Sequence, residues 1–403
     1  MTTTLPRIGV AVIGFGWMGQ AHSRSYARMA SLFPDRAAEV DLIVCSDPLA
    51  SRREEAVRSF GFRTSTDDPV AAINHPDVHA VIVCTPNMFH EELAVAAAKA
   101  GKHVFCEKPV GGTPEQTIRT AAAARAAGVI TGVGYNYRWA PLVQYAKSLI
   151  ESGALGTITN YRGRFFSMYG SDPLGLLSWR FEHDGAGYGV SSDILSHSID
   201  LAHMLNGPIT EVVGLRHTFI TDRPMPRPDS GGTHYDRGAP GDPTGPVTNE
   251  DYAGCFVRFA NGSIGAFEAS RAIVGPQSQM AFEIYGTKGS IMWNLETMNE
   301  MRIFLAERGG NLHDGYTTVY AGDRYPFHGN FVPGDANSIG YEDLKAIECL
   351  QFANAIANGS QHQPGFTEAV AYVNVQSALI RSWESGAWER VRPTALDESG
   401  VAL

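Results

Sequence analysis

Residues 8–19 read IGVAVIGFGWMG, and this stretch decides the fold. An apolar run rich in β-branched residues leads into three glycines spaced as GxGxxG, and Gln20–Met29 then has helical character. In such a strand–turn–helix unit, Gly14 permits the tight turn, Gly16 lets the backbone approach a pyrophosphate, and Gly19 lets helix and strand pack closely. Free N–H groups at the start of the helix favour the phosphates. The stretch therefore predicts a dinucleotide-binding turn.

Outward from this turn, apolar and helix-compatible segments alternate up to about residue 133. We expect strands at Arg7–Ile13, Val40–Cys45, His79–Cys84, His103–Cys106 and Val129–Val133, with helices at Leu49–Phe60, Glu91–Ala100 and Pro114–Ala127. Strands that are apolar throughout and separated by helices are typical of a parallel sheet covered on both faces. The sequence therefore predicts an α/β protein whose residues 1–135 form a doubly wound Rossmann domain.

The pattern changes after about residue 150. We expect longer strands at Thr157–Phe166, Cys255–Phe259, Ile264–Ala269, Met280–Tyr285 and Ser290–Asn294, followed by closing helices at Tyr341–Asn358 and Glu368–Ser385. Turn signals at Asn261-Gly262 and Lys288-Gly289 favour an open, mostly antiparallel sheet. Pro224–Pro246, rich in Pro and Gly, predicts a long loop. We therefore expect residues 136–403 to form a second α/β domain that binds substrate and forms oligomer contacts.

The composition narrows the possible functions. Lys and Arg total 32 against 42 acidic residues, and the net charge of −10 has the wrong sign for a general nucleic-acid binder. No apolar run approaches the roughly 20 residues that cross a bilayer, and the first seven residues do not resemble a signal peptide. We therefore expect a cytoplasmic protein. Five widely spaced cysteines with no CxxC pair predict buried reduced thiols, and outside residues 193–200 no His, Cys and carboxylate set has metal-ligand spacing, so no metal is expected.

An acidic residue after the second strand bears on the choice of cofactor. Asp47 would accept hydrogen bonds from both ribose hydroxyls of NAD and would repel a 2′-phosphate. It lies 28 positions after Gly19, more than the usual roughly 20, and an insertion at Ser31–Glu39 accounts for the excess. Arg52 and Arg53 follow closely and would suit NADP, or they lie on a solvated helix face. We expect NAD, with NADP as the alternative.

Two groups suit proton transfer. Oxidation of an alcohol removes a proton from oxygen as a hydride leaves carbon, so a base must lie within reach of the hydroxyl. Asp193, His197 and Asp200 have the i, i+4, i+7 spacing of one helix face, and histidine is suited to the base role. The alternative for His197 is a structural histidine. Lys108 follows a strand end, where its ammonium would stabilise a developing alkoxide. Its alternative is a surface lysine.

Four further motifs stand in a fixed order along the chain. They are Cys84-Thr85-Pro86-Asn87 with His90, Glu107-Lys108-Pro109, Gly134-Tyr135-Asn136-Tyr137-Arg138, and Asp193-x-x-x-His197-x-x-Asp200. Together with the glycine turn, this ordered set resembles the Gfo/Idh/MocA family of sugar and polyol oxidoreductases over essentially the whole chain. Leu177–Phe181 and Phe282–Thr287 look similar to the levoglucosan dehydrogenase branch of that family.

The resemblance implies a nicotinamide cofactor, frequent dimers or tetramers, and a peptide bond before Pro109 that is often cis. It implies catalytic roles for Lys108, Asp193 and His197. Cofactor contacts are expected from Gly14, Phe15, Gly16, Trp17, Met18, Gly19, Asp47, Thr85, Pro86, Asn87, His90, Glu107, Lys108, Asn136 and Arg138. His90 either reaches the cofactor or only begins a helix. Glu107 either lies along the nicotinamide ribose or forms a structural pair.

Substrate contacts are expected from the catalytic residues and from side chains that suit a sugar, because aromatic faces and charged groups bind its rings and hydroxyls. They are Lys108, Tyr135, Tyr169, Trp179, Arg180, Asp193 and His197, with Arg164 and Arg271 as further candidates. Asp200 is expected to support the others from behind.

Three functions stay open at this stage. The leading one is an NAD(P)-dependent dehydrogenase that transfers a hydride between a secondary hydroxyl of a sugar, glycoside or polyol and nicotinamide. The second is an oxidoreductive glycosidase that retains its NAD through oxidation, elimination, hydration and re-reduction. The third is a non-catalytic Rossmann-type sensor. The partners expected are a small carbohydrate or polyol and further copies of the chain, as a homodimer or homotetramer, with neither nucleic acid nor membrane.

Overall fold

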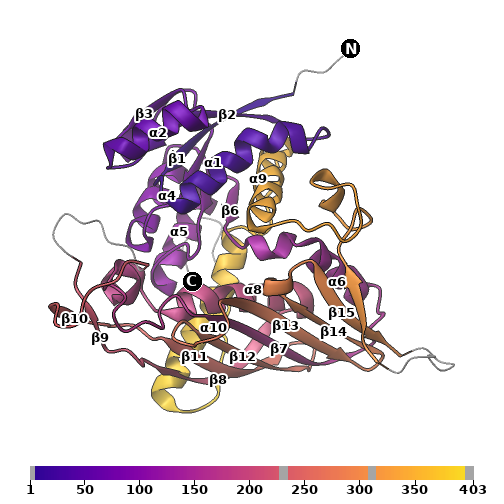
Figure 1. Ribbon diagram of the computed structural model, residues 1–403. Helices are drawn as coiled ribbons and strands as arrows, with labels where there is room; N and C mark the ends of the chain where they lie inside the picture. Colours follow the sequence, from indigo (N-terminus) through magenta and orange to yellow (C-terminus); the bar gives the residue numbers. More distant parts are fainter. Residues whose placement is uncertain (1–4, 227–234, 307–314, 395–403) are drawn as a thin grey trace. The chain divides into compact units, whose positions relative to one another are not determined.

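The computed structural model describes residues 5–226, 235–306 and 315–394 (Figure 1). The chain divides into two compact units. The first comprises residues 1–139, 339–371 and 394–403, and the second comprises residues 140–338 and 372–393. Among the described residues, no helix is both long and apolar enough to cross a membrane.

The first unit contains a six-stranded parallel sheet in the order β3-β2-β1-β4-β5-β6. Its strands are β1 (Arg7–Ile13), β2 (Glu39–Ser46), β3 (Thr64–Thr66), β4 (Ala80–Val83), β5 (His103–Cys106) and β6 (Thr131–Val133). Its helices are α1 (Trp17–Leu32), α2 (Ala50–Phe60), α3 (Pro69–Ile73), α4 (His90–Lys99), α5 (Pro114–Ala126) and α9 (Tyr341–Asn358). This strand order confirms the predicted doubly wound Rossmann fold.

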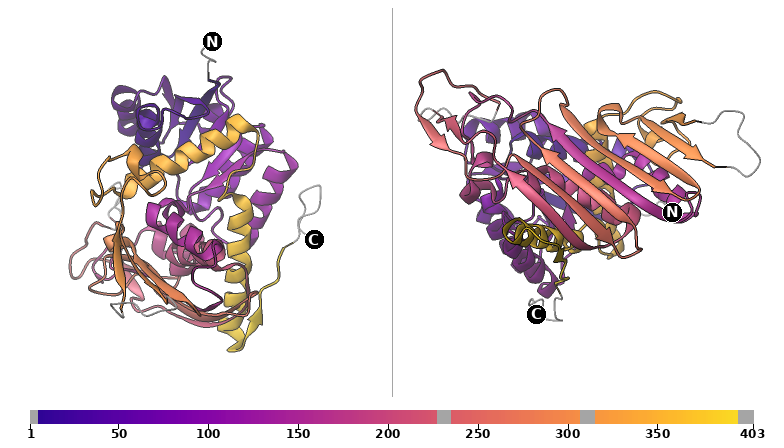
Figure 2. Two further views of the ribbon diagram at one scale, coloured as in Figure 1. Left: turned by 90° about the vertical axis from the view of Figure 1, so that its right-hand side faces the viewer. Right: turned by 90° about the horizontal axis from the view of Figure 1, so that it is seen from below.

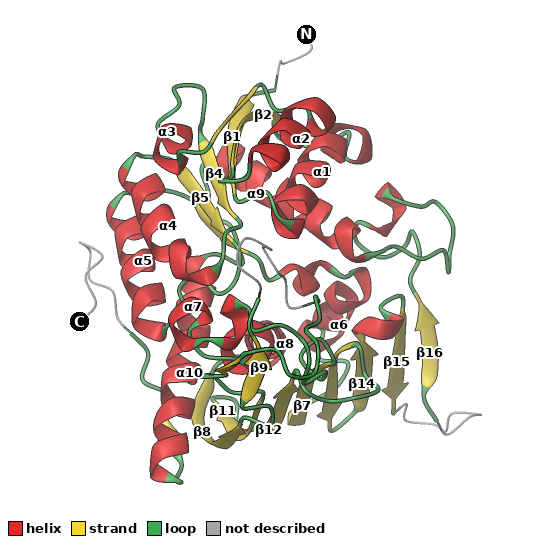
Figure 3. Ribbon diagram, turned by 60° about the vertical axis from the view of Figure 1, so that its left-hand side comes forward, coloured by secondary structure: helices red, strands yellow, loops and turns green. Residues whose placement is uncertain are grey.

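Helices cover both faces of this sheet, as its sequence requires. α1 packs against α2 and α9, whereas α4 packs against α3 and α5 (Figure 3). All four residues of β4 are buried, which explains why that strand is apolar without alternation. α5 begins with a capping box between Thr113 and Gln116, and α2 ends at Gly61 in a left-handed conformation. β3 and α3 were not among the predicted elements, because both are short.

The second unit contains a nine-stranded sheet in the order β16-β15-β14-β13-β7-β12-β11-β8-β17 (Figure 2). Its strands are β7 (Ile158–Ser167), β8 (Ile209–His217), β11 (Tyr252–Phe259), β12 (Ile264–Ser270), β13 (Ser278–Gly286), β14 (Gly289–Asn294), β15 (Glu300–Leu305), β16 (Thr317–Tyr320) and β17 (Glu389–Arg390). Neighbouring strands are antiparallel except for the parallel pair β12 and β7, so the mostly antiparallel sheet is confirmed.

Aromatic stacking builds the core of this sheet. The Tyr161 ring stacks on Phe267 at 5.6 Å and on Phe282 at 6.3 Å, and Phe282 stacks on Trp293 at 5.7 Å between centroids. The helices of this unit are α6 (Pro141–Glu151), α7 (His183–Ala186) and α8 (Ser196–Asn206), and α10 (Phe366–Ser385) contributes residues to both units. α8 packs on β7. The sheet therefore supplies a rigid base for α8.

Two expectations on organisation need correction. Residues 339–371 belong to the first unit and not to an unbroken 136–403 domain, because α9 pairs with α1 through Arg24–Glu342 and Arg28–Asp343 ion pairs. The expected Pro224–Pro246 loop has a short strand at each end, where β9 (Asp222–Pro224) pairs antiparallel with β10 (Thr244–Pro246). Residues 227–234 of that segment lie outside the described residues.

Candidate active site

The glycine turn of the first unit has the shape that a pyrophosphate needs. A Cβ on Gly14, whose φ is +88°, would lie 2.8 Å from the Cys84 carbonyl carbon, and one on Gly19 would lie 2.0 Å from the Gly14 oxygen. These two glycines are therefore required by packing. A Cβ on Gly16 would meet nothing within 4 Å, and α1 begins there with no side-chain cap. The open space and uncapped N–H groups fit a bound dinucleotide.

The other residues of the turn divide into buried and exposed ones. The Phe15 ring is fully buried and packs edge-on against Phe60 and Phe62, so its side chain belongs to the core. Trp17 is 59% exposed, and its ring stacks on Tyr341 at 5.4 Å. The Met18 sulfur lies 3.8 Å from the Tyr341 hydroxyl. Tyr341 of α9 thus supports the turn, a contact that local sequence spacing does not reveal.

Asp47 is fixed at the carboxyl end of β2. Its carboxylate accepts hydrogen bonds from the backbone N–H groups of Phe15 at 2.8 Å and Leu49 at 2.9 Å. Arg53 donates to the carbonyls of Asp47 and Pro48, so its guanidinium is used locally. Arg52 lies 3.4 Å from the Asp47 carboxylate and is partly exposed. A carboxylate held beside the glycine turn suits a ribose with free hydroxyls.

His90 braces the loops that follow β4 and β5. Its ring nitrogens lie 2.7 Å from the Pro109 carbonyl oxygen and 2.8 Å from that of Thr85. Burial lowers the pKa of His90, although both carbonyls favour its protonated form. Since both nitrogens are engaged, the structure favours the interpretation in which His90 begins α4 and supports the motif. In the same motif, Pro86 precedes a short 3-10 turn that begins at the buried Asn87.

Glu107 forms a buried structural pair. One carboxylate oxygen lies 2.6 Å from Nζ of Lys345 and 2.8 Å from Nε2 of His22, and the other accepts from the backbone N–H of Lys108 at 3.3 Å. Burial raises the pKa of Glu107, but the charge of Lys345 and the hydrogen bonds from His22 and Lys345 hold it below its ordinary value. Of the two interpretations of Glu107, the structure favours the pair over the ribose contact.

Lys345 also lies 2.8 Å from a carboxylate oxygen of Glu348. His22, Glu107 and Glu348 could by themselves hold a metal ion, since their ligand atoms lie within 4.8 Å of one another. Here the Lys345 ammonium contacts both carboxylates, so the cluster already contains its cation. Next to it, the Lys108–Pro109 peptide bond is cis.

The Gly134–Arg138 motif packs around this cluster. A Cβ on Gly134 would lie 2.3 Å from a Glu107 carboxylate oxygen, so a larger residue here would displace that carboxylate or the backbone. Tyr135, Asn136 and Arg138 follow β6 and are all buried. Burial and the nearby Arg138 charge lower the pKa of His362 to about 4. These side chains of the motif are therefore buried in the first unit, and the cofactor and substrate contacts expected from them stay predictions.

In the second unit, Asp193 and His197 do not lie on one regular helix. Ser191–Leu195 forms a π-helical turn, and α8 begins only at Ser196. The regular helix expected over all three residues therefore holds only from Ser196 on, with His197 and Asp200 in α8 and Asp193 in the π turn before it. His197 and Asp200 are buried in α8, and Asp193 is partly exposed. Single-turn π-bulges of this kind are frequent at functional sites.

Side chains on other elements hold the π turn in place. The backbone N–H and the hydroxyl of Ser191 both donate to one carboxylate oxygen of Glu250, at 2.9 and 2.7 Å. Gln376 of α10 donates to the hydroxyls of Ser191 and Ser192. A Cβ on Gly189 would lie 2.0 Å from the Glu250 carbonyl oxygen, which explains that glycine.

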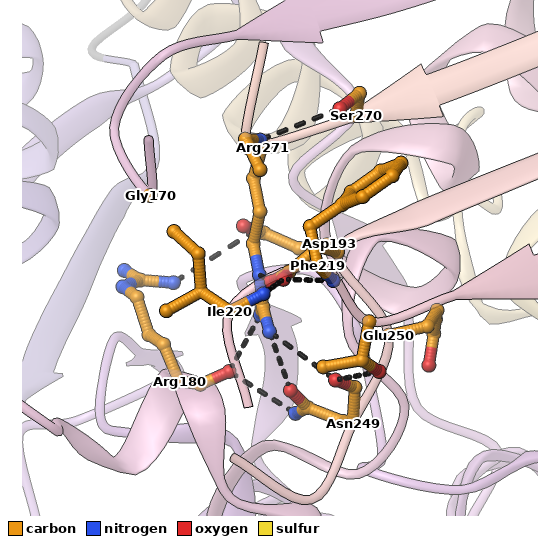
Figure 4. Close-up of polar contacts among 12 residues, drawn as sticks. Gly170, Arg180, Asp193, Phe219, Ile220, Asn249, Glu250, Ser270 and Arg271 are labelled. Carbon is orange, nitrogen blue, oxygen red and sulfur yellow. Dashed lines mark hydrogen bonds and ion pairs between the residues drawn. The ribbon is translucent and has the colours of Figure 1, made fainter. Parts of the chain in front are cut away.

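Asp193 contacts two of the predicted substrate residues. The Tyr169 hydroxyl donates to one carboxylate oxygen at 2.8 Å. A guanidinium nitrogen of Arg180 lies 3.9 Å from the other oxygen (Figure 4). Arg180 also lies over the Trp179 ring, 4.4 Å from its centroid. Burial and the Asp193 charge raise the pKa of Tyr169, so its hydroxyl stays protonated. The His197 ring lies 6.0 Å from the Phe165 ring, between centroids.

The two further arginine candidates both make bonds within the second unit. Arg164 donates to Gln279 and Glu283 across the sheet. Arg271 is buried and donates to Asp251, Asn249 and the Arg180 carbonyl. These bonds favour a structural role for the buried Arg271. Arg164 is partly exposed and uses only two of its five N–H donors in them, so its expected substrate contact stays a prediction.

Two protein-family models match this chain. Residues 8–135 match the model described as "Oxidoreductase family, NAD-binding Rossmann fold" and residues 143–292 match "GFO/IDH/MocA C-terminal domain". The chain belongs to the Gfo/Idh/MocA oxidoreductase family. The predicted family, fold class and NAD cofactor are thereby confirmed.

Individual relatives cover nearly the whole chain. Levoglucosan dehydrogenase of Pseudarthrobacter phenanthrenivorans is 37% identical over 95% of this chain and 98% of its own. The scyllo-inositol 2-dehydrogenase (NAD(+)) of Bacillus subtilis is 28% identical over 93% of this chain and 92% of its own. Among solved structures, a levoglucosan dehydrogenase in complex with NADH and L-sorbose superposes with a TM-score of 0.90 at 37% identity, covering 96% of this chain and 99% of that one.

Proposed function

We propose that this member of the family oxidises a secondary hydroxyl of a cyclic sugar, glycoside or polyol, with NAD as hydride acceptor. One observation carries the proposal: a fixed carboxylate, Asp193, contacts Tyr169 and Arg180 four residues before His197. An arrangement of donors and an acceptor of this kind suits vicinal sugar hydroxyls. The uncapped glycine turn and Asp47 in the first unit supply the matching cofactor site.

Bound NAD would supply the electrophilic nicotinamide carbon that receives the hydride. The turn residues 14–19 and Asp47 would hold it, with Thr85, Pro86, Asn87, Asn136 and Arg138 as further expected contacts. His197 would take the proton from the reacting hydroxyl as general base. Lys108 would donate a hydrogen bond to the same oxygen and stabilise its developing charge. Asp193, with Tyr169 and Arg180, would bind a neighbouring hydroxyl and so orient the ring, while Tyr135 and Trp179 complete the proposed substrate contacts.

The relatives narrow the substrate to rings that carry several secondary hydroxyls. Their names include levoglucosan, inositol and D-glucoside dehydrogenases. Levoglucosan is our first candidate, because that relative matches over 95% of this chain. The same names favour a dehydrogenase over a glycosidase that retains its NAD. The presence of Lys108, Asp193 and His197 together favours a dehydrogenase over a sensor.

A panel of levoglucosan, inositols, free sugars and aryl glucosides with added NAD tests the proposal. A dehydrogenase forms one NADH per product molecule. A glycosidase releases aglycone without lasting NADH. If sugars bind but neither product forms, the dehydrogenase assignment is wrong and a sensor remains.

We further propose that the protein acts as a homodimer or homotetramer. Leu215, Phe256 and Ile264, on the adjacent strands β8, β11 and β12, are 59%, 60% and 54% exposed, and such side chains favour a covered sheet face. Light scattering of the purified protein tests the assembly state.

A cytoplasmic location is proposed from the five free cysteines and from the use of the cellular NAD pool, and cell fractionation tests it.

A further inference from the structure

We propose that two buried arginines, Arg223 and Arg271, position the loop 169–181 and thereby determine which sugar the second unit accepts. The loop carries Tyr169 and Arg180, which both face Asp193. The inference rests on the proposed function for its substrate. Neither arginine is assigned a catalytic role, because each acts through the loop backbone.

Arg271 fixes the end of the loop that carries Arg180. Only 1% exposed, it donates from Nε to Asp251 at 2.7 Å and from one terminal nitrogen to the Arg180 carbonyl at 3.0 Å (Figure 4). Its other terminal nitrogen donates to Oδ1 of Asn249 at 2.7 Å. The amide of Asn249 donates in turn to the same Arg180 carbonyl at 3.1 Å. Two side chains therefore fix one backbone oxygen.

Asp251 completes the support of Arg271. Its second carboxylate oxygen accepts from the backbone N–H groups of Phe219 and Ile220, each at 3.0 Å. The carboxylate and the guanidinium are almost fully buried, at 0% and 1% side-chain exposure. A buried ion pair of this kind is expensive to desolvate and persists only where hydrogen bonds satisfy it. The bonds of this ion pair to the backbone of Arg180, Phe219 and Ile220 indicate that its role is to hold these segments in position.

Arg223 fixes the other end of the loop. It is also 1% exposed, and its guanidinium donates to the carbonyls of Gly170, Asp172 and Gly175, the Asp172 bond measuring 2.8 Å. The backbone of Arg271 also bonds to this end of the loop, since its carbonyl accepts a hydrogen bond from the Gly170 N–H at 2.8 Å. Both ends of the loop are thus attached to the same pair of arginines.

Phe181 lies against both guanidiniums. The guanidinium carbon of Arg223 lies 3.9 Å from its ring centroid and that of Arg271 lies 4.5 Å away. A ring face attracts a cation, and a desolvated contact of this kind strengthens the interaction. Burial lowers the pKa of Arg223, and the Arg271 charge acts in the same direction, while the Asp251 charge opposes both. The contacts to the ring and the Asp251 carboxylate therefore let two buried cations lie close together.

The consequence concerns substrate binding. If a guanidinium is removed, buried carbonyl oxygens lose their donors, and the loop must move to find new partners. A displacement of about 1 Å at Tyr169 or Arg180 is enough to weaken the hydrogen bonds to a ring hydroxyl. Misplacements of this size lower enzyme rates by up to about 10²-fold. We therefore expect these arginines to act on sugar binding and not on cofactor binding.

The experiment compares Arg271→Met and Arg223→Met with Arg258→Met, an exposed arginine of β11. In the two loop variants, we expect the KM for the accepted sugar to rise about tenfold or more, kcat to fall by less than about threefold, and the Kd for NADH to stay unchanged. The control should retain wild-type constants. Arg271→Lys keeps the charge but loses the planar fork, so we expect it to behave like Arg271→Met.

Hydrogen–deuterium exchange supplies a readout that needs no substrate. We expect faster exchange in residues 170–181 of both variants and unchanged exchange in β13 and β14. Unchanged exchange in the loop, an unchanged sugar KM, or full recovery by Arg271→Lys would each overturn the inference. If no sugar is turned over by the wild type, the proposed function fails, while exchange still tests the positioning.

If the methionine variants do not fold, a milder variant tests the inference. Asn249→Ser keeps both arginine side chains. It removes the amide donor to the Arg180 and Gly187 carbonyls and the Oδ1 acceptor of Arg271. A smaller rise in sugar KM with faster exchange near residue 180 is expected. An unchanged KM and unchanged exchange in that variant would overturn the inference.

Discussion

At the scale of single residues, the positions of polar residues in the sequence do not show which groups they contact in the folded chain. Asp47 is bonded to two backbone N–H groups, and Glu107 is bonded to Lys345 and His22. The sequence therefore identifies the residue types correctly, but only the fold shows which of them are already engaged. Asp193 is partly exposed, and we propose that it binds a hydroxyl of the substrate.

The first prediction concerns the general base. His197→Ala should lower kcat by about 10²-fold or more, because the hydroxyl proton would then lose its acceptor. The Kd for NADH should not change, since the glycine turn lies in the other unit. Steady-state kinetics and NADH fluorescence titration measure the two effects. His217→Ala, at an exposed position of β8, is the matched control, and equal activity of both variants would remove His197 from the mechanism.

A second prediction concerns cofactor choice. Asp47→Ala should lower the ratio of kcat/KM for NAD to that for NADP by about tenfold or more, because a charge-assisted hydrogen bond to the ribose is lost and repulsion of a 2′-phosphate is relieved. Glu54→Ala removes an exposed carboxylate of the neighbouring helix α2 and should leave the ratio unchanged. A ratio that is the same in wild type and Asp47→Ala would contradict the assignment.

At the scale of elements, most strands and helices follow from the sequence. β1 and α9 have the predicted bounds, and the apolar runs of β4 and β5 identify a sheet buried on both faces. The π turn at Ser191–Leu195 could not be predicted, because it depends on Glu250 and Gln376, which lie far away in sequence. Local periodicity predicts a regular helix there, and tertiary hydrogen bonds override it.

A third prediction belongs to the element formed by β6 and its following motif. Gly134→Ala places a Cβ 2.3 Å from the Glu107 carboxylate, so the carboxylate or β6 must move. We expect a loss of about 1–3 kcal/mol in the free energy of unfolding, together with lower kcat through displaced Lys108. Thermal unfolding and kinetics measure both. Gly315→Ala, which meets open space, should be neutral, and a Gly134→Ala variant equally unaffected would contradict the packing argument.

At the scale of the whole chain, the first unit is completed by residues that are distant in sequence. The chain leaves it at residue 139, builds the second unit, and returns with α9. Sequence patterns gave α9 as a helix but not its location, because an apolar helix can pack on either unit. Lys345 and Glu348, which α9 contributes, complete the cluster around Glu107 and were not among the predicted site residues. Both residues lie far from Glu107 in the sequence, so no local sequence pattern indicates that they join its cluster.

The last prediction follows from that cluster. Lys345→Met leaves Glu107 and Glu348 buried without their shared cation, and breaking a buried pair in this way costs about 3–5 kcal/mol of unfolding free energy. The double variant Lys345→Met with Glu348→Gln removes one of the two carboxylate charges, and Glu107 keeps its bond to His22. It should therefore regain part of the loss. Urea unfolding of both variants is compared with that of Lys147→Met, at a partly exposed position of α6. A single variant as stable as the control would mean that the buried contacts of Lys345 with Glu107 and Glu348 do not stabilise the fold.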